Sequence, residues 1–137
     1  MRLDLIRIII DFGLVVLIWM IQIIVYPSFK YYSNNGLIKW HKKYTFRLAL
    51  IVIPLMCFQL FIYAFQTLKL HNAYPILGLT IVVLIWFYTF WQFVPLHNKI
   101  QSDTHSVETL SDLTRKNWFR TLLWTILFIL SVLEFAT

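Results

Sequence analysis

The sequence predicts an all-α fold, a polytopic transmembrane four-helix bundle that forms a single domain over residues 1–137. Of the 137 residues, 60% are hydrophobic and only 13% are charged. An ordinary soluble domain is about 45–50% apolar and about 25% charged. A soluble domain of this size has too much surface to cover so many apolar side chains. The composition therefore excludes a soluble globular domain and a disordered chain, and the lone Cys57 excludes a disulfide scaffold.

Four apolar runs are long enough to cross a bilayer, which takes roughly 20 residues per helix. They cover about residues 8–26, 49–68, 76–94 and 118–136. The runs are continuously apolar and do not alternate with period two, which favours helices over the strands of a membrane barrel. Pro27 predicts that the first helix ends near Tyr26, because proline disfavours helical backbone in the residue before it.

Basic residues concentrate at one end of the predicted bundle. Four spans place the two longer connections at one end, and both termini with the turn at Lys69 at the other. The first end carries nine of the 12 Lys and Arg residues, and the second carries Arg2, Arg7 and Lys69. This bias predicts a bacterial inner-membrane protein with both long loops cytoplasmic and both termini outside. The basic residues behind the net charge of +6 then determine the topology and contact anionic lipids of the bilayer. No nucleic-acid partner is predicted.

Polar side chains collect at the helix ends on the predicted cytoplasmic side. The catalytic candidates are His41, His97, Arg120 and Asn117, and the substrate-binding candidates are Gln22, Tyr26, Tyr44, Gln92 and Trp124. Imidazoles transfer protons near neutral pH, and a guanidinium beside an amide can hold a developing oxyanion. These residues predict one polar pocket at the inner leaflet. The alternative is an ordinary membrane interface, where polar and aromatic side chains normally gather.

Arg120 is the charge expected to organise this pocket, because a guanidinium one turn inside a membrane helix must reach the headgroups or find acceptors. Candidate acceptors are Gln22, Tyr44, Gln92 and the free backbone carbonyls near Pro95. We expect such bonds to tie the helix ends together, so that Arg120→Leu lowers the thermal stability.

Two polar residues lie deeper in the spans. Asp11 and Gln59 have similar depths when each residue advances 1.5 Å along its helix, which predicts a hydrogen bond between helices. The alternative is that Asp11 reaches Arg7, four residues earlier on the same helix. No motif identifies a cofactor. The three histidines on the basic side lack the usual spacing of metal ligands, so no metal site is predicted.

Several short motifs resemble those of known membrane proteins. They are WMIQ (19–22), YPSF (26–29), PLM (54–56), VPLHNK (94–99) and NWFRT (117–121), together with His41, Arg47, Trp124 and Thr125. The set resembles a family of small, functionally uncharacterised four-helix bacterial membrane proteins, and more distantly the anthrone-oxygenase-like membrane proteins. The resemblance implies the four-helix topology and, through the distant group, oxidation of a lipophilic substrate. Tyr44 and Gln59 depart from that family, which often has His and Glu at these positions.

Two classes of function follow. The first is an accessory or assembly subunit that packs its aromatic-rich helix faces against a larger membrane partner. The alternative is a membrane-embedded oxidoreductase of the anthrone-oxygenase type, acting on a lipophilic small molecule in the inner-leaflet pocket. A channel component is disfavoured, because a pore needs a polar stripe through the membrane and the spans offer few polar groups at depth.

Overall fold

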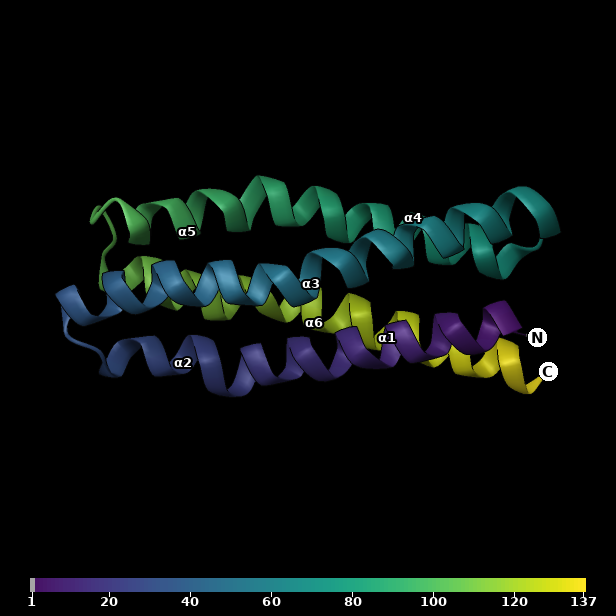
Figure 1. Ribbon diagram of the computed structural model, residues 1–137, viewed down its shortest axis with the longest axis horizontal. Coiled ribbons are helices and arrows are strands. Elements are labelled where there is room, and N and C mark those ends of the chain that lie inside the picture. Colours follow the sequence, from purple (N-terminus) through teal and green to yellow (C-terminus); the bar gives the residue numbers. More distant parts are fainter. Residues whose placement is uncertain (1) are drawn as a thin grey trace.

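The computed structural model describes residues 2–137, with side chains from Leu3 onward, and over this range the chain forms four long helical rods (Figure 1). This confirms the all-α prediction. The first rod comprises α1 (Arg2–Met20), the π-helical turn η1 (Ile21–Val25), α2 (Tyr26–Ser28) and the 3-10 turn η2 (Phe29–Tyr31). The second rod is α3 (Asn34–Leu70). The third comprises α4 (Ala73–Tyr88), the π-helical turn η3 (Thr89–Phe93) and α5 (Val94–Gln101), and the fourth is α6 (Val107–Ala136).

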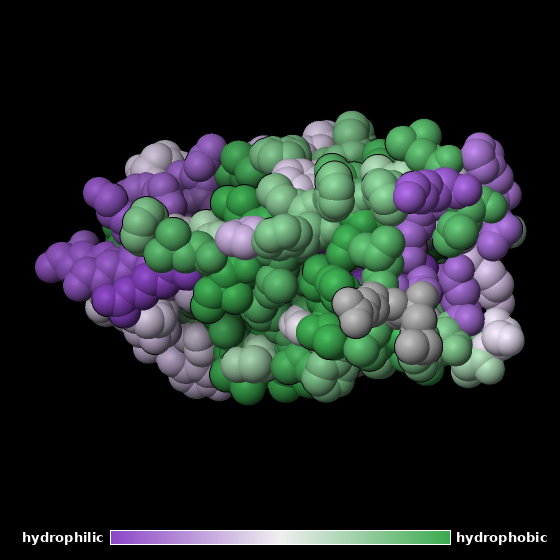
Figure 2. Space-filling view, turned by 45° about the vertical axis from the view of Figure 1, so that its right-hand side comes forward, coloured by the Kyte–Doolittle hydropathy of each residue, from purple (hydrophilic) through white to green (hydrophobic). Residues whose placement is uncertain are grey.

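The rods pack as a closed ring, in which α1 contacts α3 and α6, and α4 contacts the same two helices. The connections 32–33 and 102–106 lie at one end, here called the loop end, and both termini lie at the other (Figure 1). Each rod is long and apolar enough to cross a membrane. Figure 2 shows the corresponding apolar band between two polar ends. All four helices extend past the apolar runs of the sequence at the loop end, so this end projects beyond the band.

Pro27 does not end the first helix, contrary to the expectation from sequence. The helix continues to Tyr31, because the widened turn η1 ends two residues before the proline. The Tyr26 N–H bonds to the Ile21 carbonyl five residues back, instead of the usual four. A π-turn thus removes the clash that a proline ring makes with an α-helical carbonyl. Pro95 repeats the arrangement, since the Val94 N–H bonds to the Thr89 carbonyl.

Arg7 is the centre of a buried polar cluster at the terminal end, here called the terminal network. Its side chain is 1% exposed. Nε donates to Ser131 Oγ at 2.9 Å, Nη1 donates to Gln66 Oε1 at 2.7 Å, and Nη2 lies 2.5 Å from Glu134 Oε2. One guanidinium therefore connects α1 to both α3 and α6. Such contacts matter in a bilayer, because lipid competes with apolar packing between helices.

Asp11 completes the terminal network one turn further along α1. It is fully buried and accepts hydrogen bonds from Gln59 Nε2 at 2.6 Å and from the Tyr63 hydroxyl at 2.8 Å. The predicted bond between Asp11 and Gln59 is confirmed. Gln59 in turn accepts a bond from Trp124 Nε1 at 3.3 Å, so the network also reaches α6 here.

Gly78 on α4 gives the ring of Tyr63 its space. A Cβ at this position would lie 2.1 Å from Tyr63 Cε1, and the ring cannot swing away without losing its bond to Asp11. We expect Gly78→Ala to lower the free energy of unfolding by about 1–3 kcal/mol, as overpacking does. Thermal unfolding in detergent measures this as a lower Tm. Gly13→Ala is the matched control, because nothing lies within 4 Å of a Cβ there, and its Tm should equal or exceed that of the wild type. Equal Tm values for the two variants would contradict the prediction.

Candidate functional site

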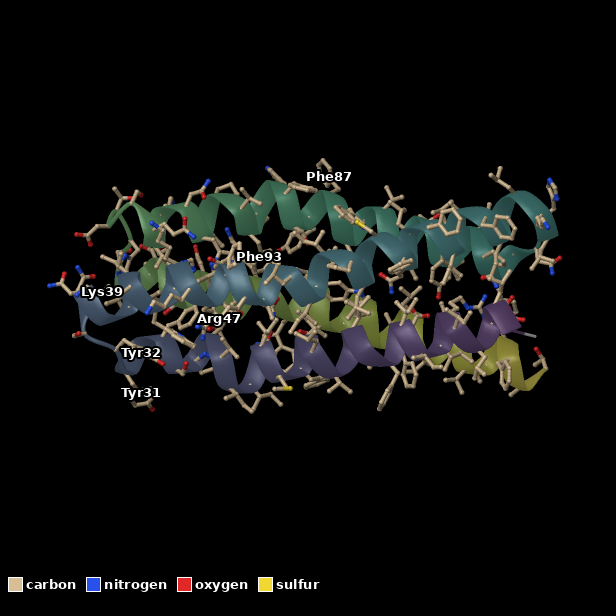
Figure 3. All side chains as sticks on the ribbon, in the orientation of Figure 1. Tyr31, Tyr32, Lys39, Arg47, Phe87 and Phe93 are labelled. Carbon is tan, nitrogen blue, oxygen red and sulfur yellow. The ribbon has the colours of Figure 1, made fainter. Side chains whose placement is uncertain are left out.

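A cavity of about 380 Å³ lies among the four rods, toward the loop end. Apolar side chains from α1, α3 and η3 form most of its wall, among them Leu14, Ile18, Val52 and Phe93. Figure 3 shows Phe93 directed into the bundle, whereas Phe87 points away from it. The exposed lining residues Ile53, Phe90 and Val94 lie on α3 and on the η3–α5 segment. The cavity therefore opens sideways between these two rods, toward the apolar surroundings.

Polar side chains from every rod meet on the wall of this cavity. They are Tyr26 from α2, Tyr44 from α3, His97 from α5 and Arg120 from α6. All four were predicted site residues, and the structure brings them together. The two π-turns contribute to this, because each contains one residue more than an α-helical turn. The turn η1 comes just before Tyr26, and η3 comes four residues before His97. An apolar cavity with a few convergent polar groups is the usual form of a small-molecule site.

Arg120 is buried without the partners that the sequence analysis expected. Its side chain is 6% exposed, and the guanidinium lies over the rings of Phe93 and Trp124, with centroid distances of 4.2 and 5.2 Å. Its Nε has no hydrogen-bond acceptor, and no carboxylate among the described residues pairs with it. The expected bonds to Gln22, Gln92 or the carbonyls near Pro95 are absent from the described residues. The Tyr26 hydroxyl lies within hydrogen-bonding reach of the guanidinium, and Tyr44 is a further electrostatic neighbour.

The two predicted histidines form a hydrogen-bonded chain that ends at the cavity. His41 Nε2 lies 2.7 Å from His97 Nδ1, and His97 Nε2 lies 3.1 Å from the Tyr26 hydroxyl. His41 is fully buried behind His97 and does not line the cavity. His105 of the 102–106 loop is its electrostatic neighbour. Among the described residues, no group of three or more His, Cys, Asp or Glu side chains could hold a metal ion.

The remaining predicted residues lie outside the cavity wall, except Trp124. Asn117 Nδ2 donates to Gln22 Oε1 at 2.9 Å, and Gln22 Nε2 donates to the Thr114 carbonyl at 3.1 Å. These two amides connect α6 to η1, which is the connection that the sequence analysis expected Arg120 to make. The substrate-binding prediction for Gln92 finds no support in its position, because Gln92 accepts a bond from Lys116 Nζ at 2.8 Å and does not line the cavity.

Among the cavity residues that the sequence analysis did not predict, Phe93 and Trp86 lie nearest in character to the predicted polar and aromatic set. Phe93 stacks with Tyr26 and lies beneath the Arg120 guanidinium. Trp86 lines the cavity with a buried Nε1 that has no hydrogen-bond partner in the part of the chain that the structure describes. Both lie within an apolar run, where an aromatic side chain in a bundle core and one facing lipid have the same sequence signal.

Comparison with known proteins adds no family to this geometry. No protein-family model, curated protein or solved structure matches this chain. The family resemblance of the sequence motifs therefore stays a prediction.

The two buried arginines should respond oppositely to removal of their charge. Arg7→Met leaves Glu134 and Gln66 without their partner, and we expect it to cost about 3–5 kcal/mol of stability, as loss of one member of a buried ion pair does. Arg120→Leu removes a buried charge that has no carboxylate partner, so we expect a Tm equal to or above that of the wild type. This replaces the sequence-based expectation of a lower Tm. Thermal unfolding of the wild type and both variants in the same detergent measures the difference, and a Tm for Arg120→Leu below that of the wild type would refute the prediction.

Proposed function

We propose that this integral membrane protein binds a lipophilic molecule with an anionic or carbonyl head group, and that the head group pairs with Arg120. The supporting observation is the buried guanidinium on the wall of an apolar cavity, with an Nε for which the described residues supply no acceptor. A buried polar group without a partner is costly, and natural proteins retain such groups where a ligand supplies the partner. The Tyr26 and Tyr44 hydroxyls provide two further hydrogen-bonding groups beside Arg120.

The size of the cavity suits a ligand of two or three fused rings, or a folded acyl chain. An engineered apolar cavity of about 150 Å³ holds benzene, and this cavity has about 380 Å³. The sideways opening between α3 and η3 faces the apolar band, so the ligand would enter from the bilayer. A molecule that partitions into membranes fits this route better than a water-soluble metabolite.

The same geometry supports the oxidoreductase alternative of the anthrone-oxygenase type. In that reaction class the protein first removes a proton from carbon beside a carbonyl. The Tyr26–His97 pair would accept this proton, and Arg120 would stabilise the resulting enolate oxygen. Asn117 is not part of this proposal, because it bonds to Gln22 behind the cavity wall. The oxidant would be molecular oxygen.

We place the protein in the bacterial inner membrane with its loop end in the cytoplasm. Of the nine basic residues assigned to that end, Arg120 is buried, and the other eight are at least partly exposed: Lys30, Lys39, Lys42, Lys43, Arg47, Lys99, Arg115 and Lys116. Lys and Arg near the ends of spans are retained on the cytoplasmic side. The cavity would then lie in the inner leaflet.

An accessory role beside a larger membrane protein is the competing proposal. Its support is the set of large aromatic side chains exposed along the rods, such as Phe58, Phe61, Phe90 and Trp91. Aromatic side chains are enriched where proteins contact one another. Purification in mild detergent tests it: a stoichiometric protein partner would support the role, and a chain that purifies alone would contradict it.

Ligand binding is measurable with a matched pair of fluorescent three-ring probes, anthracene-9-carboxylate and anthracene. We expect the wild type to prefer the carboxylate, and Arg120→Leu to weaken its binding about 10- to 100-fold while leaving anthracene unaffected, since a hydrogen bond to a charged group contributes about 1.5–3 kcal/mol. Arg120→Lys should restore part of the preference, because an ammonium keeps the charge without the planar fork. Arg115→Leu is the control, because that side chain is 77% exposed at the loop end. Equal binding of both probes to the wild type would contradict the proposal.

A further inference from the structure

The hydrogen-bonded chain from His41 through His97 to Tyr26 has a property that ligand binding does not require. Each imidazole bonds to a neighbour through a ring nitrogen, and His97 does so through both. In a neutral imidazole one nitrogen donates and the other accepts. A bond at one ring therefore determines which nitrogen is protonated at the next, so the three side chains change their protonation together.

Two arrangements of protons satisfy this chain. In the first, His41 Nε2–H donates to His97 Nδ1, His97 Nε2–H donates to the Tyr26 oxygen, and the Tyr26 O–H is free for the cavity. In the second, the Tyr26 O–H donates to His97 Nε2, and His97 Nδ1–H donates to His41 Nε2. His41 then carries its proton on Nδ1. To pass from the first arrangement to the second, one proton shifts along each bond toward Tyr26, His41 Nδ1 takes up a proton, and Tyr26 releases its free hydroxyl proton.

The two ends of the chain lie in different surroundings. Tyr26 lines the cavity beside Arg120. His41 Nδ1, at the other end, has no hydrogen-bond partner within the described residues, and the neighbouring His105 belongs to the partly exposed 102–106 loop. The charged or titratable groups around the two rings are His105 from this loop, Tyr26 from α2, Tyr44 from α3 and Arg120 from α6. No carboxylate is among them to trap the proton on one ring.

Aromatic packing fixes the geometry of the chain. Phe29 meets the His41 ring edge-on, with centroids 5.8 Å apart and planes at 70°. Phe93 stacks on Tyr26 at 16°. The two imidazoles lie 4.9 Å apart, centroid to centroid. Side chains that cannot rotate keep short donor–acceptor distances, which proton transfer requires.

We propose that His41, His97 and Tyr26 form a proton relay between the loop end and the cavity. Tyr26 gives its hydroxyl proton to the oxygen of a bound anion, and His97 Nε2–H replaces that proton. His41 Nε2–H then moves to His97 Nδ1, and His41 Nδ1 takes up a proton from the His105 side. One proton thus passes from the loop end to the ligand, no electron is transferred, and the reverse sequence carries a proton outward. The ligand end of this relay rests on the proposed function, whereas the coupled imidazole pair does not.

The first test needs no ligand. In full-length protein with ¹⁵N-labelled histidine, NMR should show scalar coupling between His41 Nε2 and His97 Nδ1 across their hydrogen bond. The shifts of both nitrogens should be intermediate between those of N–H and bare nitrogen, because both arrangements are populated. His41→Phe should abolish the coupling. His71→Asn, at the terminal end, should preserve it, since asparagine tolerates the left-handed backbone at position 71 (φ 49°). Absence of the coupling, or one fixed tautomer, would overturn the relay.

The second test measures proton delivery to 2-naphthol, a weak acid that fluoresces differently when ionised. After a pH jump in stopped flow, we expect His41→Ala to slow protonation of the bound naphtholate about 100-fold, the scale of general acid–base effects, without changing its Kd. Added imidazole should restore the rate by filling the space left by the ring. An unchanged rate, or a slow rate that imidazole does not restore, would overturn the relay. If 2-naphthol does not bind the wild type, the proposed function fails, and the tautomer exchange measured by NMR decides on the relay.

Discussion

The terminal network is the set of interactions on which the arrangement of the four rods depends. In a bilayer, lipid tails replace apolar helix contacts at little cost, so apolar packing alone does not determine which helices pair. Arg7 overcomes this by bonding α1 to Gln66 on α3 and to Ser131 and Glu134 on α6. Asp11 repeats the linkage to α3 through Gln59 and Tyr63. These bonds hold α1, α3 and α6 in one register. The remaining rod packs through α4 against α3 and α6.

The two halves of the bundle use buried charge in opposite ways. At the terminal end the guanidinium of Arg7 meets carboxylate, amide and hydroxyl oxygens, so loss of this side chain would leave buried polar groups without their partner. Nearer the loops, Arg120 meets aromatic faces and an apolar cavity, so its burial subtracts from the stability unless something else binds there. Proteins accept such a cost where a site must be ready for a ligand.

Much of the fold could be predicted from the sequence, because four apolar runs and a shortage of charge leave one architecture. The site was predicted in part: polar residues near helix ends pointed to Tyr26, Tyr44, His97 and Arg120, whose helix ends a four-rod topology brings together. Arg7 was counted with the charges of the terminal end and named as an alternative partner of Asp11, since nothing in its local sequence reveals Glu134, 127 positions away, as its partner. Trp86 and Phe93 were missed because aromatic residues in apolar runs give no sign of the side they face.

The widened turns η1 and η3 have a consequence for how this chain tolerates change in length. Each contains one residue more than an α-helical turn, and the side chains that follow are rotated by about 100° relative to a regular helix. Deleting a single residue from 21–25 would restore a regular helix and carry Tyr26 away from His97, although the first apolar run would still be long enough to cross a membrane. In natural variants of this chain, a gap of one position in either turn would therefore separate proteins that keep the site from proteins that keep only the bundle.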